Sequence, residues 1–302
     1  NMVYLILENK HITHVHFIHF NYYSYEDWRL NMNRPADFHT HSLFSSDSDA
    51  KPEENIKAAI NLGLSSICFT EHNDFDFPPE DNKDVLFQLD FDNYISSIAS
   101  IKELYSEQIP VYIGVEQGLC RSAADRINDY DKNHILDFII GSSHLVYGND
   151  PYYPKFWEGR NIDEVINAYY ESILDNLDTC NNFDIYGHID YIIRYIPDKS
   201  YEYNYKNFSD IIDEVLKKII YNGKGIEINT AGLRYGLNAT NPSAEIVLRY
   251  RELGGEIITI GSDAHYSRDI GSEFDIAYDM LKSCNFKYYN IFRKRKPEFI
   301  QL

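Results

Sequence analysis

A His-x-His pair followed by an acidic turn is the feature of this sequence that most directly suggests chemistry. His39 and His41 lie at the end of a short apolar run, and Asp47 follows six residues later in a serine-rich turn. Side chains alternate between the two faces of an extended strand, so both imidazoles point the same way. Neutral imidazole is the commonest metal ligand in proteins. The spacing therefore suggests a metal site, although such a pair alone is a weak signal.

The elements that must position these residues recur along the chain. Short apolar runs alternate with helical patterns, which predicts a parallel sheet whose function gathers at the carboxyl ends of the strands. The seven predicted strands cover residues 36–40, 66–70, 110–115, 137–141, 183–187, 225–229 and 256–260.

The predicted helices carry recognisable start and stop residues. One helix has Pro52 in its first turn and Gly63 at its end, the usual placement of these two residues. Another opens at a capping box beginning with Asn161, and a third is expected to be capped by Ser209. A last helix over residues 273–284 precedes a basic tail.

Every predicted strand ends in, or is closely followed by, side chains that can bind a metal ion. Any one of them alone is more often a cap, a turn former or a solvated side chain. Gathering so many acidic and imidazole groups at one rim would be costly without a cation. We therefore predict a site for several metal ions. The residues concerned are His39, His41, Glu71, His72, Glu116, His144, His188, Asp190, Glu227, Asn229, Asp263 and His265.

The first 34 residues differ from the remainder of the chain. Residues 11–19 alternate like a strand and contain a second His-x-His pair, His14 and His16. An additional metal site is one interpretation, and an appended edge strand or extension is the favoured one, because no acidic partner follows. We predict an N-terminal extension over 1–34 and a single domain over 35–302.

Composition limits the classes of partner. The 302 residues are 44% hydrophobic, which allows a substantial core, and the formal net charge is -19. Such a surface would repel a phosphate backbone, so we expect no nucleic-acid partner. The four cysteines lack CxxC spacing, which favours reduced thiols in the cytoplasm. Because no apolar run reaches membrane-spanning length, we expect no membrane partner. The chain itself is expected to be a monomer or homodimer.

Seven short motifs resemble, in order and spacing, those of the PHP (polymerase and histidinol phosphatase) superfamily. They are DFHTHS, FTEHND, IGVEQG, GSSHL, YGHIDY, EINTAGLR and GSDAH, and the resemblance runs from about residue 36 to the C-terminus. Three stretches, GVEQGL, GHIDYIIRY and EINTAGLR, most resemble the monofunctional histidinol-phosphate phosphatases. The resemblance implies an α/β fold of the PHP type, a distorted seven-stranded TIM-like barrel over residues 35–302 with a trinuclear metal centre.

The same resemblance implies a set of ligands for three divalent ions. The first ion would be bound by His39, His41, Glu116 and Asp263. The second would share Glu116 as a bridge and add His144 and His188, and the third would use Asp47, His72 and His265. Mixed imidazole and carboxylate ligands suit Zn, Mn or Fe.

The implied activity is hydrolysis of L-histidinol phosphate to L-histidinol and phosphate in histidine biosynthesis. The expected mechanism is in-line attack by a metal-bound hydroxide, without a phosphoenzyme. Arg194 and Arg234 are expected to bind the phosphate, and Asp263 and His265 to take part in catalysis. The alternatives are a PHP phosphoesterase acting on another small phosphate or a nucleotide, and a non-catalytic metal-binding protein.

Several neighbouring residues receive supporting roles. Asp190 is expected to orient a ligand histidine, with leaving-group acid as the alternative. Glu71 is expected to support a ligand, and Asn229 to hydrogen-bond at the rim. The loop around Asp150, which contains several tyrosines, could stack the imidazole of histidinol phosphate and pair with its ammonium group, or be an ordered surface flap.

Overall fold

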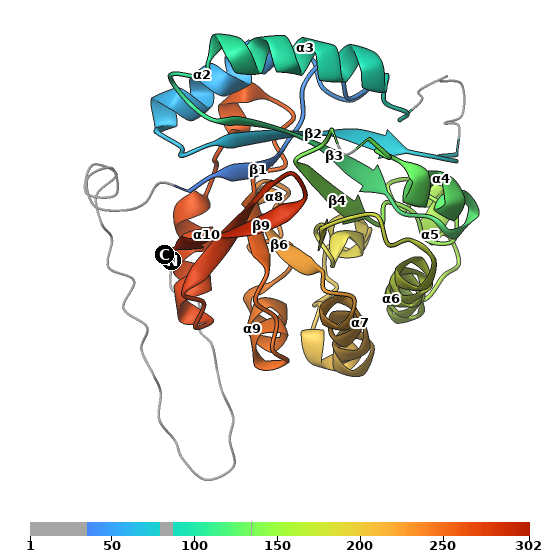
Figure 1. Ribbon diagram of the computed structural model, residues 1–302. Helices are drawn as coiled ribbons and strands as arrows, with labels where there is room; N and C mark the ends of the chain where they lie inside the picture. The colour runs from blue at the N-terminus through green and yellow to red at the C-terminus, as the bar shows by residue number, and fades with distance from the viewer. Residues whose placement is uncertain (1–34, 79–86, 134) are drawn as a thin grey trace. The chain divides into compact units, whose positions relative to one another are not determined.

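Every predicted apolar run forms a strand, and the strands pair in the order of the chain. The computed structural model describes residues 35–78, 87–133 and 135–302 (Figure 1). All neighbouring strands in the order β1 to β7 are parallel. The strands are β1 (Asp37–Thr40), β2 (Ile67–Asp74), β3 (Val111–Gly118), β4 (Phe138–Ser142), β5 (Ile185–Tyr186), β6 (Gly225–Asn229) and β7 (Ile258–Gly261).

Backbone hydrogen bonds between β1 and the end of β7 close the sheet into a barrel. Asp263 N donates to His39 O at 2.8 Å, and His41 N donates to Ala264 O at 2.9 Å. The two segments approach so closely that a Cβ on Gly261 would lie 2.3 Å from the Cβ of His39, which requires glycine there. The predicted seven-stranded barrel is therefore confirmed.

Helices surround the barrel on its outer side (Figure 1). The α-helices are α2 (Pro52–Leu62), α3 (Phe91–Leu104), α4 (Ala124–Asp129), α5 (Pro154–Trp157), α6 (Ile162–Thr179), α7 (Ser209–Tyr221), α8 (Ala231–Arg234), α9 (Ala244–Glu252) and α10 (Phe274–Ser283). Short 3₁₀ helices are η1 (Arg121–Ala123), η2 (Tyr191–Tyr195), η3 (Tyr205–Phe208) and η4 (Ser267–Asp269). Within the described ranges, no helix has both the length and the apolar character needed to cross a membrane.

The predicted helix boundaries are mostly confirmed. Pro52 is the first residue of α2, and Gly63 follows its end with a left-handed φ of 72°. The side chain of Asn161 caps α6 by accepting a hydrogen bond from Glu164 N at 3.2 Å. The prediction for Ser209 is wrong, because η3 leads directly into α7 and Ser209 is already its first residue.

Strands β2 and β3 continue past their predicted ends. The parallel register pairs His72 with Glu116 and Asp74 with Gly118. The sequence beyond residue 70 is polar and resembles a loop, but these polar side chains face one another inside the barrel mouth. Because they are partnered there, the strand ladder can extend through them.

The basic tail forms an antiparallel hairpin of β8 (Tyr288–Arg293) and β9 (Lys296–Gln301). Asn290 Oδ1 accepts a hydrogen bond from Ile258 N at 2.9 Å, and the ring of Phe292 lies 4.9 Å from that of Phe138. Both partners are at the starts of strands, so the hairpin covers the amino-terminal end of the barrel, in front of the strands in Figure 1. The sequence suggested no strands here because a run of basic residues occupies the hairpin turn.

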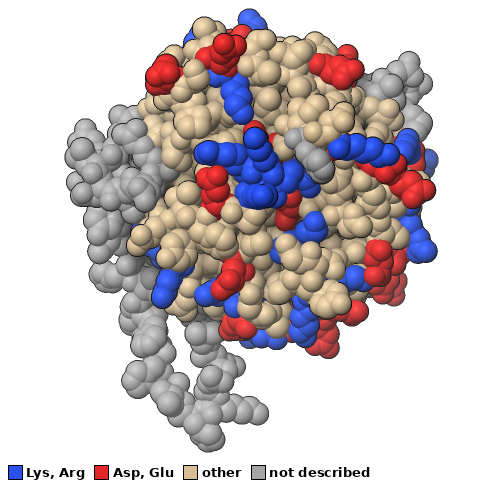
Figure 2. All heavy atoms as spheres, viewed as in Figure 1, with Lys and Arg blue, Asp and Glu red and all other residues tan. Residues whose placement is uncertain are grey.

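Basic side chains gather on this face of the barrel, as Figure 2 shows. Part of their charge is neutralised locally, since Arg295 Nε contacts Asp184 Oδ2 at 2.6 Å and Arg293 Nε contacts Glu298 Oε1 at 3.3 Å. The hairpin is thus attached to the barrel by both apolar packing and ion pairs.

The hairpin contributes to stability through its inward face. Phe292 is 2% exposed whereas Phe299 is 51% exposed. We predict that Phe292→Ala lowers the free energy of unfolding by about 3–5 kcal/mol, because it leaves a cavity under the barrel. The matched control Phe299→Ala should cost about 0.5 kcal/mol or less. Urea denaturation of both variants tests this, and equal losses would contradict the assignment of the hairpin as part of the core.

Candidate metal centre

The side chains predicted to bind metal converge at the carboxyl ends of the strands. His39, His72 and Glu116 lie within β1, β2 and β3, and the others lie on loops that directly follow a strand. Most of the group is buried, while the side chain of Asp47 is 40% exposed at the mouth. The nine residues brought together are His39, His41, Asp47, His72, Glu116, His144, His188, Asp263 and His265.

The carboxylate of Glu116 lies at the centre of this group and divides its imidazoles between its two oxygens. Oε2 faces His39 Nε2 at 3.2 Å and His72 Nδ1 at 2.9 Å. Oε1 faces His144 Nε2 at 3.1 Å and His188 Nε2 at 2.8 Å. This arrangement is what a carboxylate bridging two cations requires.

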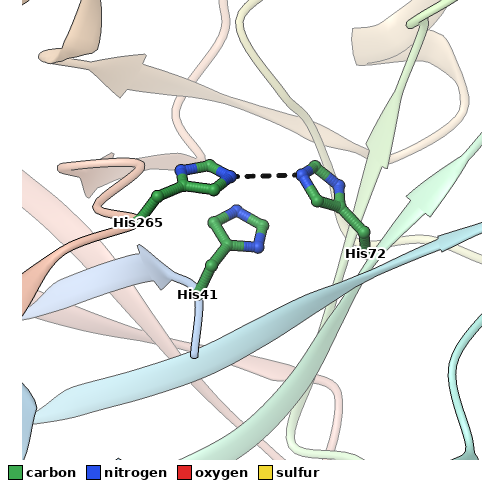
Figure 3. A group of neighbouring side chains, drawn as sticks. All are labelled: His41, His72 and His265. Atoms are coloured by element: carbon green, nitrogen blue, oxygen red, sulfur yellow. Dashed lines mark hydrogen bonds between the residues drawn. The ribbon is translucent and has the colours of Figure 1, made fainter. Parts of the chain in front are cut away.

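Three imidazoles form a second cluster beside Glu116 (Figure 3). The rings of His72 and His265 each stack on His41, with centroids 4.2 Å apart. His72 Nε2 and His265 Nε2 lie 3.4 Å from each other and 3.5 and 3.2 Å from Asp47 Oδ2. The two facing nitrogens and the carboxylate oxygen suit a shared cation.

Asp263 joins the two clusters. Its Oδ1 lies 3.7 Å from His39 Nε2 and 3.5 Å from His41 Nε2, while Oδ2 accepts a hydrogen bond from Arg194 at 3.0 Å. Asp263 has a left-handed φ of 53°, a conformation that aspartate adopts more readily than most residues. The turn after β7 thereby points this carboxylate back over the strand ends.

Buried ligand atoms that make no hydrogen bond indicate that these residues fit metal ions. Within the described part of the chain, His39 Nε2, His41 Nε2, His72 Nδ1 and Glu116 Oε2 are buried and make no hydrogen bond. Buried polar atoms are normally satisfied, so each such atom needs an explanation. Four triads of these residues place one ligand atom each within 4.8 Å of the others. A set of divalent cations would satisfy them all.

Comparison with known proteins places the chain in a family. Residues 37–231 match the model of the PHP domain. The chain belongs to the PHP domain family. This confirms the resemblance seen in the motifs.

The similar PHP proteins include named phosphatases. A probable histidinol-phosphatase of Clostridium acetobutylicum is 36% identical over 83% of this chain and 94% of its own length. The histidinol-phosphatase of Lactococcus lactis subsp. lactis is 30% identical over 84% of this chain and 92% of its own length. A crystal structure of the histidinol phosphate phosphatase HisK from that organism, complexed with zinc, L-histidinol and phosphate, matches with a TM-score of 0.79 and 28% identity. The match covers 88% of this chain and 99% of that one.

Two acidic residues hold ligand histidines of the PHP site: Glu227, which the sequence placed among the strand-end groups, and Asp74, which the sequence reasoning did not single out. His39 Nδ1 lies 2.8 and 3.0 Å from the two carboxylate oxygens of Glu227. Asp74 Oδ1 lies 2.7 Å from His144 Nδ1. In metal sites such carboxylates fix the orientation of the imidazole and raise its basicity. Strand alternation would have found Asp74, because it is two residues after His72 on the same face.

Other predicted supporting residues lie close to the site in different roles. Glu71 accepts hydrogen bonds from Ser42 and from Ser45, whose hydroxyl also contacts His41 Nδ1 at 3.1 Å, as expected of a support. Asn229 hydrogen-bonds to Asp263 Oδ2 at 3.2 Å, which agrees with its predicted place at the rim.

The prediction that Asp190 orients a ligand histidine is wrong. Its carboxylate instead accepts hydrogen bonds from Asn241 Nδ2 at 2.7 Å and Ser243 N at 3.3 Å. The chain turns into η2 directly after His188, so Asp190 points toward the loop before α9 rather than toward the imidazoles.

The two predicted phosphate-binding arginines both lie beside Asp263. Arg194 is buried and contacts its carboxylate, whereas Arg234 donates to the backbone oxygens of Ser262 at 2.5 Å and Asp263 at 3.2 Å. Arg268, by contrast, is exposed and lies over the ring of Tyr266. The structure therefore brings Arg194 and Arg234 to the edge of the PHP site.

Charges inside the site influence one another strongly. Burial lowers the pKa of His41 to about 3, helped by repulsion from His265 and His72, so this ring is neutral and its nitrogen is free to bind a cation. Burial opposes the ionised form of Glu116, but the surrounding His39, His144 and His72 hold its pKa well below the usual range. The site thus combines a neutral ligand with a permanent central anion.

The role of Asp74 can be tested through metal affinity. We predict that Asp74→Asn lowers zinc affinity by about 10–100-fold, because the amide holds His144 less firmly than the carboxylate does. The matched control is Asp76→Asn, an exposed acid two residues further on that pairs with Arg126. Competition with a zinc-binding dye measures both affinities. Equal affinities in Asp74→Asn and wild type would refute the supporting role.

Protons must compete with metal ions at this site. Burial favours the neutral ring of His144, but Asp74 and Glu116 outweigh it and raise its pKa from 6.5 to about 10. Carboxylates also raise the pKa of His39 and of His72 against the effect of burial. In the metal-free protein, the ion pairs of protonated His144 therefore contribute their full stabilisation below pH 6.5. This contribution is lost as the pH rises toward about 10.

We predict from these pKa shifts that zinc binding at pH 7 releases protons and tightens as pH increases. Calorimetric titrations in two buffers with different enthalpies of protonation measure the protons released. A binding enthalpy that is the same in both buffers would show that the imidazoles are already neutral.

Proposed function

We propose that this PHP protein hydrolyses L-histidinol phosphate to L-histidinol and phosphate, as in histidine biosynthesis. The observation that carries the proposal is the convergence of nine imidazole and carboxylate side chains around Glu116 at the barrel mouth. Support comes from the Lactococcus lactis phosphatase, which is similar over most of both chains and was crystallised with zinc, L-histidinol and phosphate.

Three divalent ions would be bound by the residues predicted from the sequence, with Glu116 shared between two of them. Such ions lower the pKa of water and offset charge on a phosphoryl group. Zn, Mn and Fe all suit the ligand set, because it contains imidazole and carboxylate but no thiolate. Glu227 and Asp74 keep His39 and His144 pointed into the site.

The chain's own residues then handle the phosphoryl group and the protons. Arg194 and Arg234 supply positive charge beside Asp263, where the transition state gains negative charge. Water attacks phosphorus in line with the departing alcohol, so the P–O bond to histidinol breaks as the new one forms. Asp263 and His265, whose Oδ1 and Nδ1 are 3.7 Å apart, can hold the proton that the water loses, and the departing histidinol oxygen takes up a proton as the P–O bond breaks.

A row of aromatic side chains suits the imidazole of the substrate. The ring of Tyr191 lies 4.9 Å from His188, and its hydroxyl accepts a hydrogen bond from Tyr195 at 3.0 Å. Tyr195 contacts Tyr152, which is 62% exposed, with ring centroids 5.8 Å apart. Asp150 accepts a hydrogen bond from Tyr152 N at 2.8 Å at the outer end of this row, and its carboxylate is the proposed partner for the substrate ammonium.

The location and assembly of the protein are parts of the same proposal. The four cysteines Cys68, Cys120, Cys180 and Cys284 are all free thiols, which favours the reducing cytoplasm. The net charge of -19 argues against a nucleic-acid substrate. A monomer or homodimer stays a prediction.

Phosphate release tests the activity directly. We predict that the protein loaded with Zn, Mn or Fe releases phosphate from L-histidinol phosphate, and that a chelator abolishes the release. Its kcat/KM should exceed that for phosphomonoesters lacking the imidazole by at least about tenfold, since the aromatic row then has no partner. The matched control is Glu116→Gln, which keeps the shape of the bridging side chain but removes its charge.

Each alternative has its own outcome in this assay. Equal rates on all small phosphates would favour a PHP phosphoesterase of broader or different specificity. Metal binding without release from any ester, with every metal tested, would favour a non-catalytic metal-binding protein.

A further inference from the structure

Arg194 is a buried cation held from several directions. Its side chain is only 3% exposed. Nη1 donates to Asp263 Oδ2 at 3.0 Å, Nη2 to Asn229 Oδ1 at 3.0 Å, and Nε to Asn241 Oδ1 at 2.8 Å. A guanidinium has five N–H donors, so these contacts of the described residues leave two for a ligand.

Two tyrosine rings also lie against the guanidinium. The carbon at its centre is 5.4 Å from the ring centroid of Tyr191 and 5.1 Å from that of Tyr235. Cation–π contacts restrict the plane of the group, whereas the hydrogen bonds restrict its rotation. Arg194 is therefore fixed before any substrate binds.

Asn241 is the contact that connects Arg194 to a part of the fold outside the metal centre. Its backbone is fixed at the end of β6, because its N and O exchange hydrogen bonds with Asn229, both at 2.8 Å. Its side chain is buried and lies between Arg194 and Asp190. In the described part of the chain, neither Asn241 nor Asp190 hydrogen-bonds to a side chain predicted to bind metal.

The chemistry of an amide makes Asp190 decisive for the orientation of Asn241. With Nδ2 donating to Asp190 Oδ1 at 2.7 Å, Oδ1 of Asn241 must face the Nε–H of Arg194. The flipped amide would oppose donor to donor at Arg194 and acceptor to carboxylate at Asp190. Asp190 is itself held, since Ser243 N donates to its other oxygen.

We propose that Asn241, oriented by Asp190, is a positioning residue that holds Arg194 ready for the phosphoryl group. The identity of the substrate in this statement rests on the proposed function. Asn241 acts only through Arg194, so its removal has no further effect once Arg194 is gone. This dependence separates positioning from a general structural role.

A double-mutant cycle tests the dependence. The variants are Arg194→Ala, Asn241→Ala and the double substitution, with Asn167→Ala at a half-buried position of α6 as matched control. Two quantities are measured on zinc-loaded protein: kcat/KM for L-histidinol phosphate, and the Kd of inorganic phosphate by calorimetry. We expect Asn241→Ala to weaken each by about 10–100-fold, and the double variant to be no worse than Arg194→Ala alone.

A conservative and a non-conservative variant at Asp190 provide a second test of the positioning role. Asp190→Asn can still accept from Asn241 Nδ2 and should keep most of the phosphate affinity. Asp190→Ala frees the amide and should reproduce the loss seen in Asn241→Ala. Zinc content and thermal unfolding of each variant separate these losses from collapse of the site, and the Asp190 pair decides the question if Asn241→Ala does not fold.

The outcomes distinguish this inference from the proposed function. Additive effects of Asn241→Ala and Arg194→Ala, or unchanged phosphate affinity in a folded, zinc-loaded Asn241→Ala, would overturn the positioning role while leaving the activity intact. If the wild type hydrolyses no phosphomonoester but the Kd values show the expected coupling, the proposed function fails and the positioning of Arg194 is supported.

Discussion

A single buried carboxylate, that of Glu116, is the constraint on which the functional end of this barrel depends. It lies inside the barrel at the end of β3, where an ionised group is stable only when positive charge surrounds it. Imidazoles delivered by β1, β2, β4 and β5 meet that need, either as cations themselves or through metal ions that replace their protons. The strand order of the barrel is what makes this convergence possible.

The amino-terminal end of the barrel stabilises the fold, whereas the carboxyl-terminal end carries the candidate site. At the amino-terminal end, the hairpin of β8 and β9 adds apolar packing and ion pairs, which stabilise the fold without entering the chemistry. At the carboxyl-terminal end, buried polar atoms are left for ligands to satisfy. TIM-like barrels divide stability and function between their ends in this way. The cost of unsatisfied groups at one end is offset by ordinary packing at the other.

Recognition of an anionic phosphate by a chain with net charge -19 requires local arrangement of positive charge. Arg194 and Arg234, the residues proposed to bind the phosphate, lie beside Asp263. Arg194 is buried at little cost because carboxylate, amides and aromatic rings all contact it. The aromatic row from Tyr191 to Tyr152 extends from His188 to the surface, where Tyr152 is exposed.

The sequence alone indicated a parallel sheet with imidazoles and carboxylates at its strand ends, because strand alternation and position at strand ends are local properties. The barrel and the set of nine ligands followed from the resemblance of its motifs to the PHP superfamily. His39 and His41 are two residues apart on one strand, and no tertiary information is needed to align them. Only the tertiary structure decided which residues support them. Asp74 meets His144 and Glu227 meets His39 across 70 and 188 residues of chain, and Asp190 turns away to Asn241. The hairpin of β8 and β9 was also decided by tertiary packing. Its inward side chains are buried only because they contact the amino-terminal end of the barrel, which the earlier strands form.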